Sequence, residues 1–380
     1  MVPFLIIFIV FNGVMHWMIW KKCIKETKLP IGLRRVGSVL LVGLFVFLIT
    51  SVFLSRKLGW LAAPAFVWMA LSWFMGSVFA CIDLLQKLVG VFFNREKDDK
   101  PEDEERRLFM RRMVGGGVVL GSTAKIGSGL KNALSTPKVK VVELTLKKLP
   151  PLPKPFVMIQ LSDVHVGNTI GRDYIQAIAD SVNEQDADLV VITGDLVDGS
   201  VEELAHAVEP LSRLKSKYGT FFSTGNHEYY SGADSWCAHL ESIGIKVLRN
   251  EHVWIGEENS GFYLAGIDDA KAGSWPGHGP DLQKALEGCD RAQAVVLLAH
   301  QPKQVFDAKE FKVDLQLSGH THGGQIWPWH YVAKASQKGL LAGHSLHAET
   351  QLYISRGTGY WGPPIRTFAS SEITRILLNG

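Results

Sequence analysis

The sequence predicts an α/β protein in which N-terminal transmembrane helices precede a domain with four layers, of the α/β/β/α type. Long apolar segments lie near the start of the 380-residue chain, and short apolar runs alternate with helical stretches over the remainder. Asp, Asn and His residues follow several of these runs, at the point where each strand should end. The length allows two or three folding units, and we divide the chain into residues 1–93, 94–137 and 138–380.

The apolar character of the chain is concentrated in three segments. Residues 1–20, 36–55 and 58–82 contain no Asp, Glu, Lys or Arg, although charged residues make up 20% of the whole chain. Each segment reaches the roughly 20 apolar residues that a helix needs to cross a bilayer. Residues 1–93 are therefore expected to form a membrane anchor with three transmembrane helices. The formal net charge of +3 disfavours a strongly basic nucleic-acid binder.

Basic residues after the first apolar segment predict the orientation of the anchor. This cluster contains one acidic residue, Glu26, among six cations, which are Lys21, Lys22, Lys25, Lys28, Arg34 and Arg35. Loops of this kind stay in the cytoplasm by the positive-inside rule. The third span should then return the chain to the cytoplasmic side of the cell membrane, before residue 94.

Residues 94–137 are expected to be a linker, solvated and highly charged up to residue 112. Arg106 and Arg107, followed by Phe109 and a short apolar stretch (Met113 to Ala124), resemble a twin-arginine export signal. If the export machinery reads this signal, the following domain lies outside the cytoplasm, which is the side we expect. The alternative is a basic patch on the cytoplasmic face beside an ordinary linker.

The pattern of the remainder of the chain predicts strands joined by helices. Apolar runs are found at 156–161, 189–193, 220–223, 295–299 and 313–317. Helical spacing of apolar residues between them, as in 174–182 and 201–214, indicates crossover helices. Further runs at 139–146, 246–248, 262–267, 352–355 and 373–378 predict additional strands and a second sheet. In such folds the carboxyl ends of the strands carry the function.

Five successive strand ends carry Asp, Asn or His. The residues concerned are Asp163, His165, Asp195, Asn226, His227, His300, His320 and His322. Each of these residues by itself is common in a turn after a strand. Together they are expected to converge on one edge of a sheet. Carboxylate, amide and imidazole ligands suit Mn, Fe or Zn rather than Ca or Mg. Two such ions clamp a phosphoryl group and lower the pKa of a shared water.

These blocks resemble the calcineurin-like metallophosphoesterase superfamily over roughly residues 150–380, with its five motifs present in order. The resemblance implies that Asp163, His165 and His322 hold one metal ion, and that Asn226, His300 and His320 hold the other. It implies that Asp195 bridges the two ions and that His227 is a catalytic group which contacts the phosphate. Glu228 departs from the pattern, because many members have Asp there.

The block from Gly319 to Gln325, with Ser355 to Tyr360, is similar to a bacterial membrane-linked branch of the superfamily. The expected function is hydrolysis of phosphate mono- or diesters by a metal-bridging hydroxide, with two Mn, Fe or Zn ions. The substrate could be a lipid or envelope phosphate or pyrophosphate, and Arg356 could contact its phosphate. The alternative is a non-catalytic metal-binding membrane scaffold or receptor with the same fold.

Overall fold

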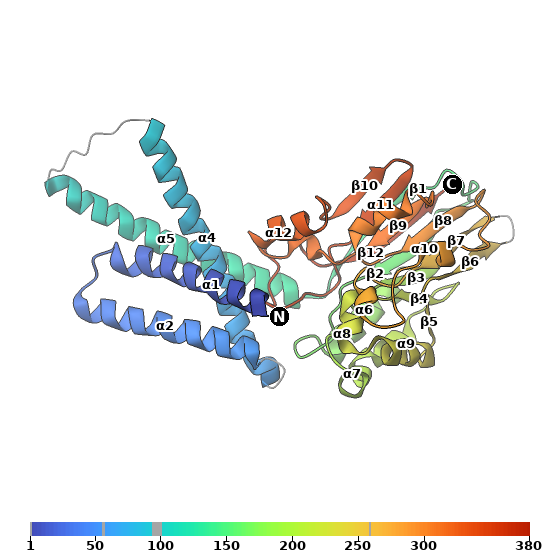
Figure 1. The fold of residues 1–380 in the computed structure, drawn as a ribbon, viewed down its shortest axis with the longest axis horizontal. Coiled ribbons are helices and arrows are strands. Elements are labelled where there is room, and N and C mark those ends of the chain that lie inside the picture. The colour runs from blue at the N-terminus through green and yellow to red at the C-terminus, as the bar shows by residue number, and fades with distance from the viewer. Residues whose placement is uncertain (1, 55–57, 93–100, 258–259) are drawn as a thin grey trace. The chain divides into compact units, whose positions relative to one another are not determined.

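A computed structural model describes residues 2–54, 58–92, 101–257 and 260–380 of the chain (Figure 1). Contacts divide the chain into two compact units. We call Met1–Lys131 with Gly362–Thr367 the anchor unit, and Asn132–Trp361 with Phe368–Gly380 the α/β unit.

The anchor unit is helical. Its elements are α1 (Val2–Ile19), the π-helix η1 (Trp20–Lys25), α2 (Ile31–Phe53), the short 3-10 helix η2 (Gly59–Ala62), α4 (Ala63–Phe92) and most of α5 (Pro101–Leu134). Within the described residues, three helical segments are long and apolar enough to cross a membrane: Leu5–Lys25, Ile31–Phe53 and Ala63–Val89. The expectation of three N-terminal apolar helices is therefore confirmed, with bounds that differ by a few residues from the predicted segments.

Polar side chains join the first and third of these segments. The Trp68 indole N–H donates to His16 Nε2 (2.9 Å), and the other ring nitrogen of His16 donates to the carbonyl of Asn12 (2.8 Å). At the other end of α1, Lys21 Nζ lies 2.9 Å from Asp83 Oδ2, and Lys22 also pairs with Asp83. These pairs satisfy polar groups that would otherwise be costly in a bilayer.

Part of the expected linker is a helix. Its first residues, 94–100, lie outside the described residues, but α5 is continuous over 34 residues from Pro101 to Leu134. The start of α5 is anchored on the loop after the first apolar segment, where Glu104 pairs with Lys28 and Arg112 Nε donates to the carbonyl of Thr27 (3.1 Å). Helix-forming Glu, Arg, Leu and Met residues explain the difference, since a run of balanced charge can pair along a helix instead of remaining coil.

The α/β unit contains two six-stranded sheets. The first has the order β1 (Lys138–Thr145), β12 (Glu372–Asn379), β2 (Phe156–Leu161), β3 (Leu189–Thr193), β4 (Thr220–Ser223) and β5 (Ile245–Val247). The second has the order β10 (Gly343–His347), β11 (Thr350–Ile354), β9 (Leu315–Ser318), β8 (Ala294–Leu298), β7 (Ser260–Gly266) and β6 (Glu251–Glu257). Strands β2 to β5 are mutually parallel, as are β7, β8, β9 and β11.

Helices and short turns connect the strands. They are α6 (Arg172–Asn183), α7 (Val201–Val208), η3 (Glu209–Arg213), α8 (Asn226–Ser231), α9 (Ala233–Ser242), η4 (Ala272–Ser274), α10 (Leu282–Ala285), η5 (Pro302–Gln304), α11 (Val305–Ala308), η6 (His322–Gly324) and α12 (Trp329–Ser336).

Three buried clusters produce the four layers. Side chains of both sheets, such as Met158 and Phe262, pack in one cluster between them. A second cluster joins the outer face of the first sheet to α6, α7 and α9, for example through Ile178 and Leu240. A third joins the second sheet to α10 and α11, for example through Leu282. This arrangement confirms the α/β/β/α fold class. It also corrects one expectation, because the polar strand ends belong to two sheets and not to one.

Candidate metal centre

The predicted site residues all follow strands at their carboxyl ends. Asp163 and His165 follow β2, Asp195 follows β3, and Asn226 and His227 follow β4. In the second sheet His300 follows β8, while His320 and His322 follow β9. Five of these residues have backbone φ between 51° and 69°, and they are Asp163, His165, Asp195, His320 and His322. Left-handed backbone at non-glycine residues is strained and concentrates at functional sites.

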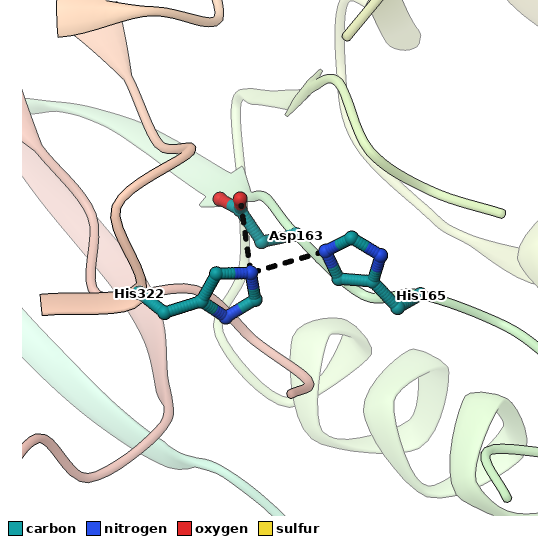
Figure 2. Close-up of side chains that lie close together, drawn as sticks. All are labelled: Asp163, His165 and His322. Atoms are coloured by element: carbon teal, nitrogen blue, oxygen red, sulfur yellow. Dashed lines mark hydrogen bonds and ion pairs between the residues drawn. The ribbon is translucent and has the colours of Figure 1, made fainter. Parts of the chain in front are cut away.

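The first group of candidate ligands contains Asp163, His165 and His322 (Figure 2). His322 Nε2 lies 3.0 Å from His165 Nε2 and 3.5 Å from Asp163 Oδ1, so both partners approach the same nitrogen. The Asp163 carboxylate is fully buried, and it accepts the backbone N–H of His320 and the hydroxyl of Ser162. Its side chain is therefore fixed before any cation binds.

The second group contains Asp195, His300 and His320. His300 Nε2 lies 3.0 Å from Asp195 Oδ2 and 3.2 Å from His320 Nδ1. Asp195 Oδ2 also lies 3.9 Å from His165 Nε2, so this carboxylate faces members of both groups. Its other oxygen accepts the backbone N–H of His227 (2.9 Å).

Two histidines are oriented in the way that metal-ligating histidines usually are. His165 Nδ1 donates to Asp198 Oδ1 (2.9 Å), and His300 Nδ1 donates to the carbonyl of Thr193 (2.8 Å). Since these oxygens only accept, each ring has its Nε2 turned toward the other ligands. A carboxylate or carbonyl behind a histidine is the common outer partner of a metal ligand.

Asn226 adds an unsatisfied oxygen to the same centre. Its Oδ1 is buried and has no hydrogen-bond partner among the residues that the structure describes. An orphaned acceptor of this kind is costly unless a ligand satisfies it. Together with two buried carboxylates and convergent imidazole nitrogens, it fits the ligand set of Mn, Fe or Zn. The residues present therefore fit the metal ions that the sequence implies.

The charges in the centre are strongly coupled. Burial alone would raise the pKa of Asp195, but His300 and the neighbouring histidines hold it well below its ordinary value. Burial would lower the pKa of His300, yet Asp195 and Asp163 raise it well above the usual range. Burial, with the neighbouring His300, lowers the pKa of His320 to about 3. His320 is therefore neutral at physiological pH, the form in which histidine binds a metal.

Asp198 is a member of the site that the sequence did not reveal. Its Oδ1 lies 2.9 Å from His165 Nδ1 and 2.6 Å from His227 Nδ1, so one oxygen orients both rings. Burial would lower the pKa of His227, but Asp195 and Asp198 raise it to about 9. The only signal in the sequence is an Asp three residues after Asp195, and that spacing is common in turns.

Glu228 supports the turn that carries Asp195. This carboxylate is fully buried and accepts the backbone N–H groups of Asp195 (3.0 Å), Leu196 (2.8 Å) and Gly225 (2.6 Å). The longer Glu side chain, which departs from the common Asp, therefore still has a full set of donors. Burial and the Asp195 charge raise the pKa of Glu228 to about 7.

Gly319 permits the close approach of the two sheets at this centre. A Cβ at this position would overlap Ser162 Oγ and Asp163 Oδ2. That Asp163 oxygen accepts the Ser162 hydroxyl and the backbone N–H of His320, so a larger residue would displace the carboxylate whose other oxygen faces His322. The glycine before His320 therefore has a packing reason that the sequence alone did not give.

Arg356, the candidate phosphate contact, follows β11. Its backbone N–H donates to Glu372 Oε1 (3.3 Å), and its Cγ lies within 3.0 Å of where a Cβ of Gly323 would be. The aliphatic part of Arg356 thus packs beside the residue that follows His322. Its contact with a phosphate stays a prediction.

Comparison with known proteins agrees with this geometry. Residues 156–324 match the family model of the calcineurin-like phosphoesterases. A transmembrane protein with a metallophosphoesterase domain from Danio rerio is 36% identical over 385 residues, which cover 95% of this chain and 85% of that protein. The chain therefore belongs to the calcineurin-like metallophosphoesterase family, and the predicted resemblance is confirmed.

Bacterial metallophosphoesterases are also among the relatives of this chain. An uncharacterized metallophosphoesterase from Helicobacter pylori strain 26695 is 39% identical over 72% of each chain. The uncharacterized metallophosphoesterase YkuE from Bacillus subtilis is 30% identical over 72% of this chain and 97% of its own. Among solved structures, the phosphopantetheinyl hydrolase PptH from Mycobacterium tuberculosis is 14% identical, with a TM-score of 0.37, over 60% of this chain and 97% of its own.

Replacing Asp198 by Asn should lower the pKa of His227 in the metal-free protein. The raised pKa of about 9 depends partly on the Asp198 charge, so Asp198→Asn should move the titration toward the ordinary value near 6.5. NMR of selectively labelled histidine, with His227→Gln for assignment, measures this. Because folding raises the pKa of His227, protonation of this ring contributes to the free energy of unfolding. This contribution is fully present below about pH 6.5 and is lost as the pH rises through about 9. An unchanged titration in Asp198→Asn would contradict the assigned pairing.

Proposed function

We propose that this protein is a membrane-anchored phosphoesterase that holds two metal ions and hydrolyses phosphate mono- or diesters. The observation that carries the proposal is the position of Asp195. Its Oδ2 faces His300 at 3.0 Å and His165 at 3.9 Å, so one buried carboxylate lies between the two ligand groups. A shared carboxylate is suited to holding two cations about 3.5–4 Å apart, as two-metal hydrolases require.

Asp163, His165 and His322 would hold one ion, while Asn226, His300 and His320 would hold the other, with Asp195 between them. Bound there, two Mn, Fe or Zn ions would supply Lewis acidity to the phosphoryl group and to an attacking water. The chain's own contribution is to fix every ligand in advance through backbone N–H donors and outer hydrogen bonds. Arg356 would add a positive charge toward the phosphate.

His227 would hold the proton that the leaving group needs. Asp198 occupies its Nδ1, so Nε2 is the nitrogen available to a substrate. The raised pKa of about 9 keeps the ring protonated near neutral pH in the metal-free protein. A protonated imidazole donates to the leaving oxygen, a general-acid role. His227 also lies in a third group with His165 and Asp195, and metal content distinguishes a catalytic role from a ligand role.

A lipid or envelope phosphate is the substrate class that the anchor favours, because an anchored enzyme meets such molecules at high local concentration. The alternative, a non-catalytic metal-binding scaffold or receptor, predicts metal binding without turnover. Turnover by the metal-loaded chain of nitrophenyl monoester, nitrophenyl diester or lipid pyrophosphate substrates separates the two. The complete set of ligand types in the centre favours the enzyme.

Replacing Asp195 should remove most bound metal. Because this carboxylate would serve both ions, Asp195→Ala should lose nearly all activity and most of both ions, whereas Asp163→Ala should chiefly weaken one. Elemental analysis of the purified full chain measures the stoichiometry. Equal metal content in the wild type and in Asp195→Ala would contradict the assignment of Asp195 as the carboxylate shared by both ions.

Replacing His227 should separate chemistry from metal binding. His227→Ala should keep two metal ions per chain, while its rate falls by about 10²–10⁴, the usual scale for general acid–base help. The loss should be smaller for a nitrophenyl ester, since nitrophenolate leaves without protonation. If metal content falls in step with activity, His227 is instead a ligand.

We further propose that the α/β unit lies outside the cytoplasm. The contacts of Glu104 and Arg112 with Lys28 and Thr27 support a cytoplasmic position for the start of α5 beside the basic loop. The rest of α5 continues to Leu134, and these 22 residues at 1.5 Å each span about 33 Å. Lys125 and Lys131 make this stretch less apolar than the three spans of the anchor unit, so the proposed crossing depends on the twin-arginine route. Exposed apolar side chains along it, such as Met113 and Leu120, suit contact with lipid.

A reporter fused after residue 135 tests this orientation. Active reporter on the outer side, lost when Arg106 and Arg107 are both replaced by Lys, is the expected result for twin-arginine export. Replacing Arg34 and Arg35 by Lys, which changes another arginine pair and keeps the charge of the basic loop, serves as the matched control and should leave export intact. Reporter activity confined to the cytoplasm in every version would overturn the proposal and favour a cytoplasmic lipid-precursor pyrophosphatase.

A further inference from the structure

Two exposed aromatic side chains flank the imidazole of His227. The Tyr230 ring centroid lies 5.3 Å from that of His227 with an interplanar angle of 74°, and the Trp361 centroid lies 5.6 Å away at 73°. Tyr230 is 53% exposed and Trp361 48% exposed, whereas the His227 side chain is only 16% exposed. Two large, solvent-exposed rings therefore contact an imidazole that is itself mostly buried.

Neighbouring residues hold the backbone of Trp361 and the ring of Tyr230. The buried side chain of Gln325 donates to the carbonyl of Trp361 (2.9 Å) and accepts its backbone N–H (3.1 Å). Tyr230 packs against Trp275, with centroids 5.6 Å apart. Aromatic side chains have only two χ angles, so they lose little conformational entropy when a ligand covers them, which makes them efficient contact surfaces.

We infer that Tyr230 and Trp361 form an apolar contact surface that selects phosphate esters whose leaving group carries an apolar portion next to the ester oxygen. The inference rests on the proposed function, in which His227 protonates the leaving oxygen. A leaving group whose oxygen lies at His227 Nε2 would lie near the two rings that contact this imidazole. Covering exposed aromatic surface with apolar atoms is favourable in proportion to the area removed from water.

The shared chemistry is an apolar leaving group, which either a lipid chain or an aromatic ring supplies. The exposed Leu346 on β10 offers a matched control. It pairs with Gln351 near the start of β11, whereas the site lies beyond the other end of that strand, after Ile354. Leu346 is 64% exposed, so replacing it by Ser removes comparable apolar surface away from His227.

The test is a chain-length series of ethyl, butyl and hexyl phosphates and the matching methyl alkyl diesters, hydrolysed by the metal-loaded full chain in one detergent. Their leaving alcohols have nearly equal acidity, so the chemistry stays constant while apolar area grows. We expect kcat/KM to rise by about two- to fourfold per methylene, since a fully buried CH₂ contributes about 0.8 kcal/mol, which is fourfold. Leu346→Ser should keep this slope and corrects for partition into detergent.

Tyr230→Ser and Trp361→Ser should each flatten the slope, while Trp361→Phe should restore most of it at unchanged metal content. Comparison of octyl with 2-phenylethyl phosphate, which have equal carbon counts, then identifies a chain-bearing or a ring-bearing leaving group. A flat series in the wild type, or an unchanged slope in both Ser variants, would overturn the inference while leaving the proposed function intact. If no ester in the series or nitrophenyl ester is hydrolysed with Mn, Fe or Zn, the proposed function itself fails.

Discussion

The buried carboxylate of Asp195 sets the main physical constraint in the α/β unit. A carboxylate removed from water is costly unless charges and hydrogen bonds compensate it. Asp195 obtains that compensation from the backbone N–H of His227 and from His300. Glu228 in turn fixes the backbone on which Asp195 sits. The loops after β3, β4 and β8 are therefore tied to one another through a single side chain, and a pair of cations would complete the balance of charge.

The two-sheet architecture supplies the rigidity that such a centre needs. Four of the five ligand loops begin at the carboxyl end of a fully buried strand, namely β3, β4, β8 and β9, and β2 is buried over its last four residues. The strands are held by one core between the sheets and by helices on both outer faces. This packing supports left-handed backbone at residues such as Asp163 and His322, whose strain would otherwise open the loops. The rigid strands thus position the ligand loops, and the strained turns orient the ligand side chains.

Asp198 would connect metal binding to proton transfer in the proposed function. One of its oxygens orients His165, a candidate ligand, and also His227, the candidate acid. The exposed rings of Tyr230 and Trp361 contact His227, so in the proposed function the phosphate chemistry and the recognition of the leaving group lie next to each other. The apolar helices of the anchor unit would add a third level of selection to the proposed activity, because amphipathic esters are enriched in membranes.

Local patterns in the sequence determined the three apolar helices, most strands and every candidate ligand from Asp163 to His322. Each of these features is local in the sequence, because an apolar run predicts a helix or a strand, and a polar residue directly after a strand lies at its carboxyl end. Only the tertiary structure decided that the ligands divide between two sheets and that Asp198 serves two histidines. It also decided that α5 is a helix where a solvated linker was expected, and that Trp361 reaches His227. These outcomes depend on packing and hydrogen bonds between residues far apart in the chain, for which neither periodicity nor spacing leaves a signal.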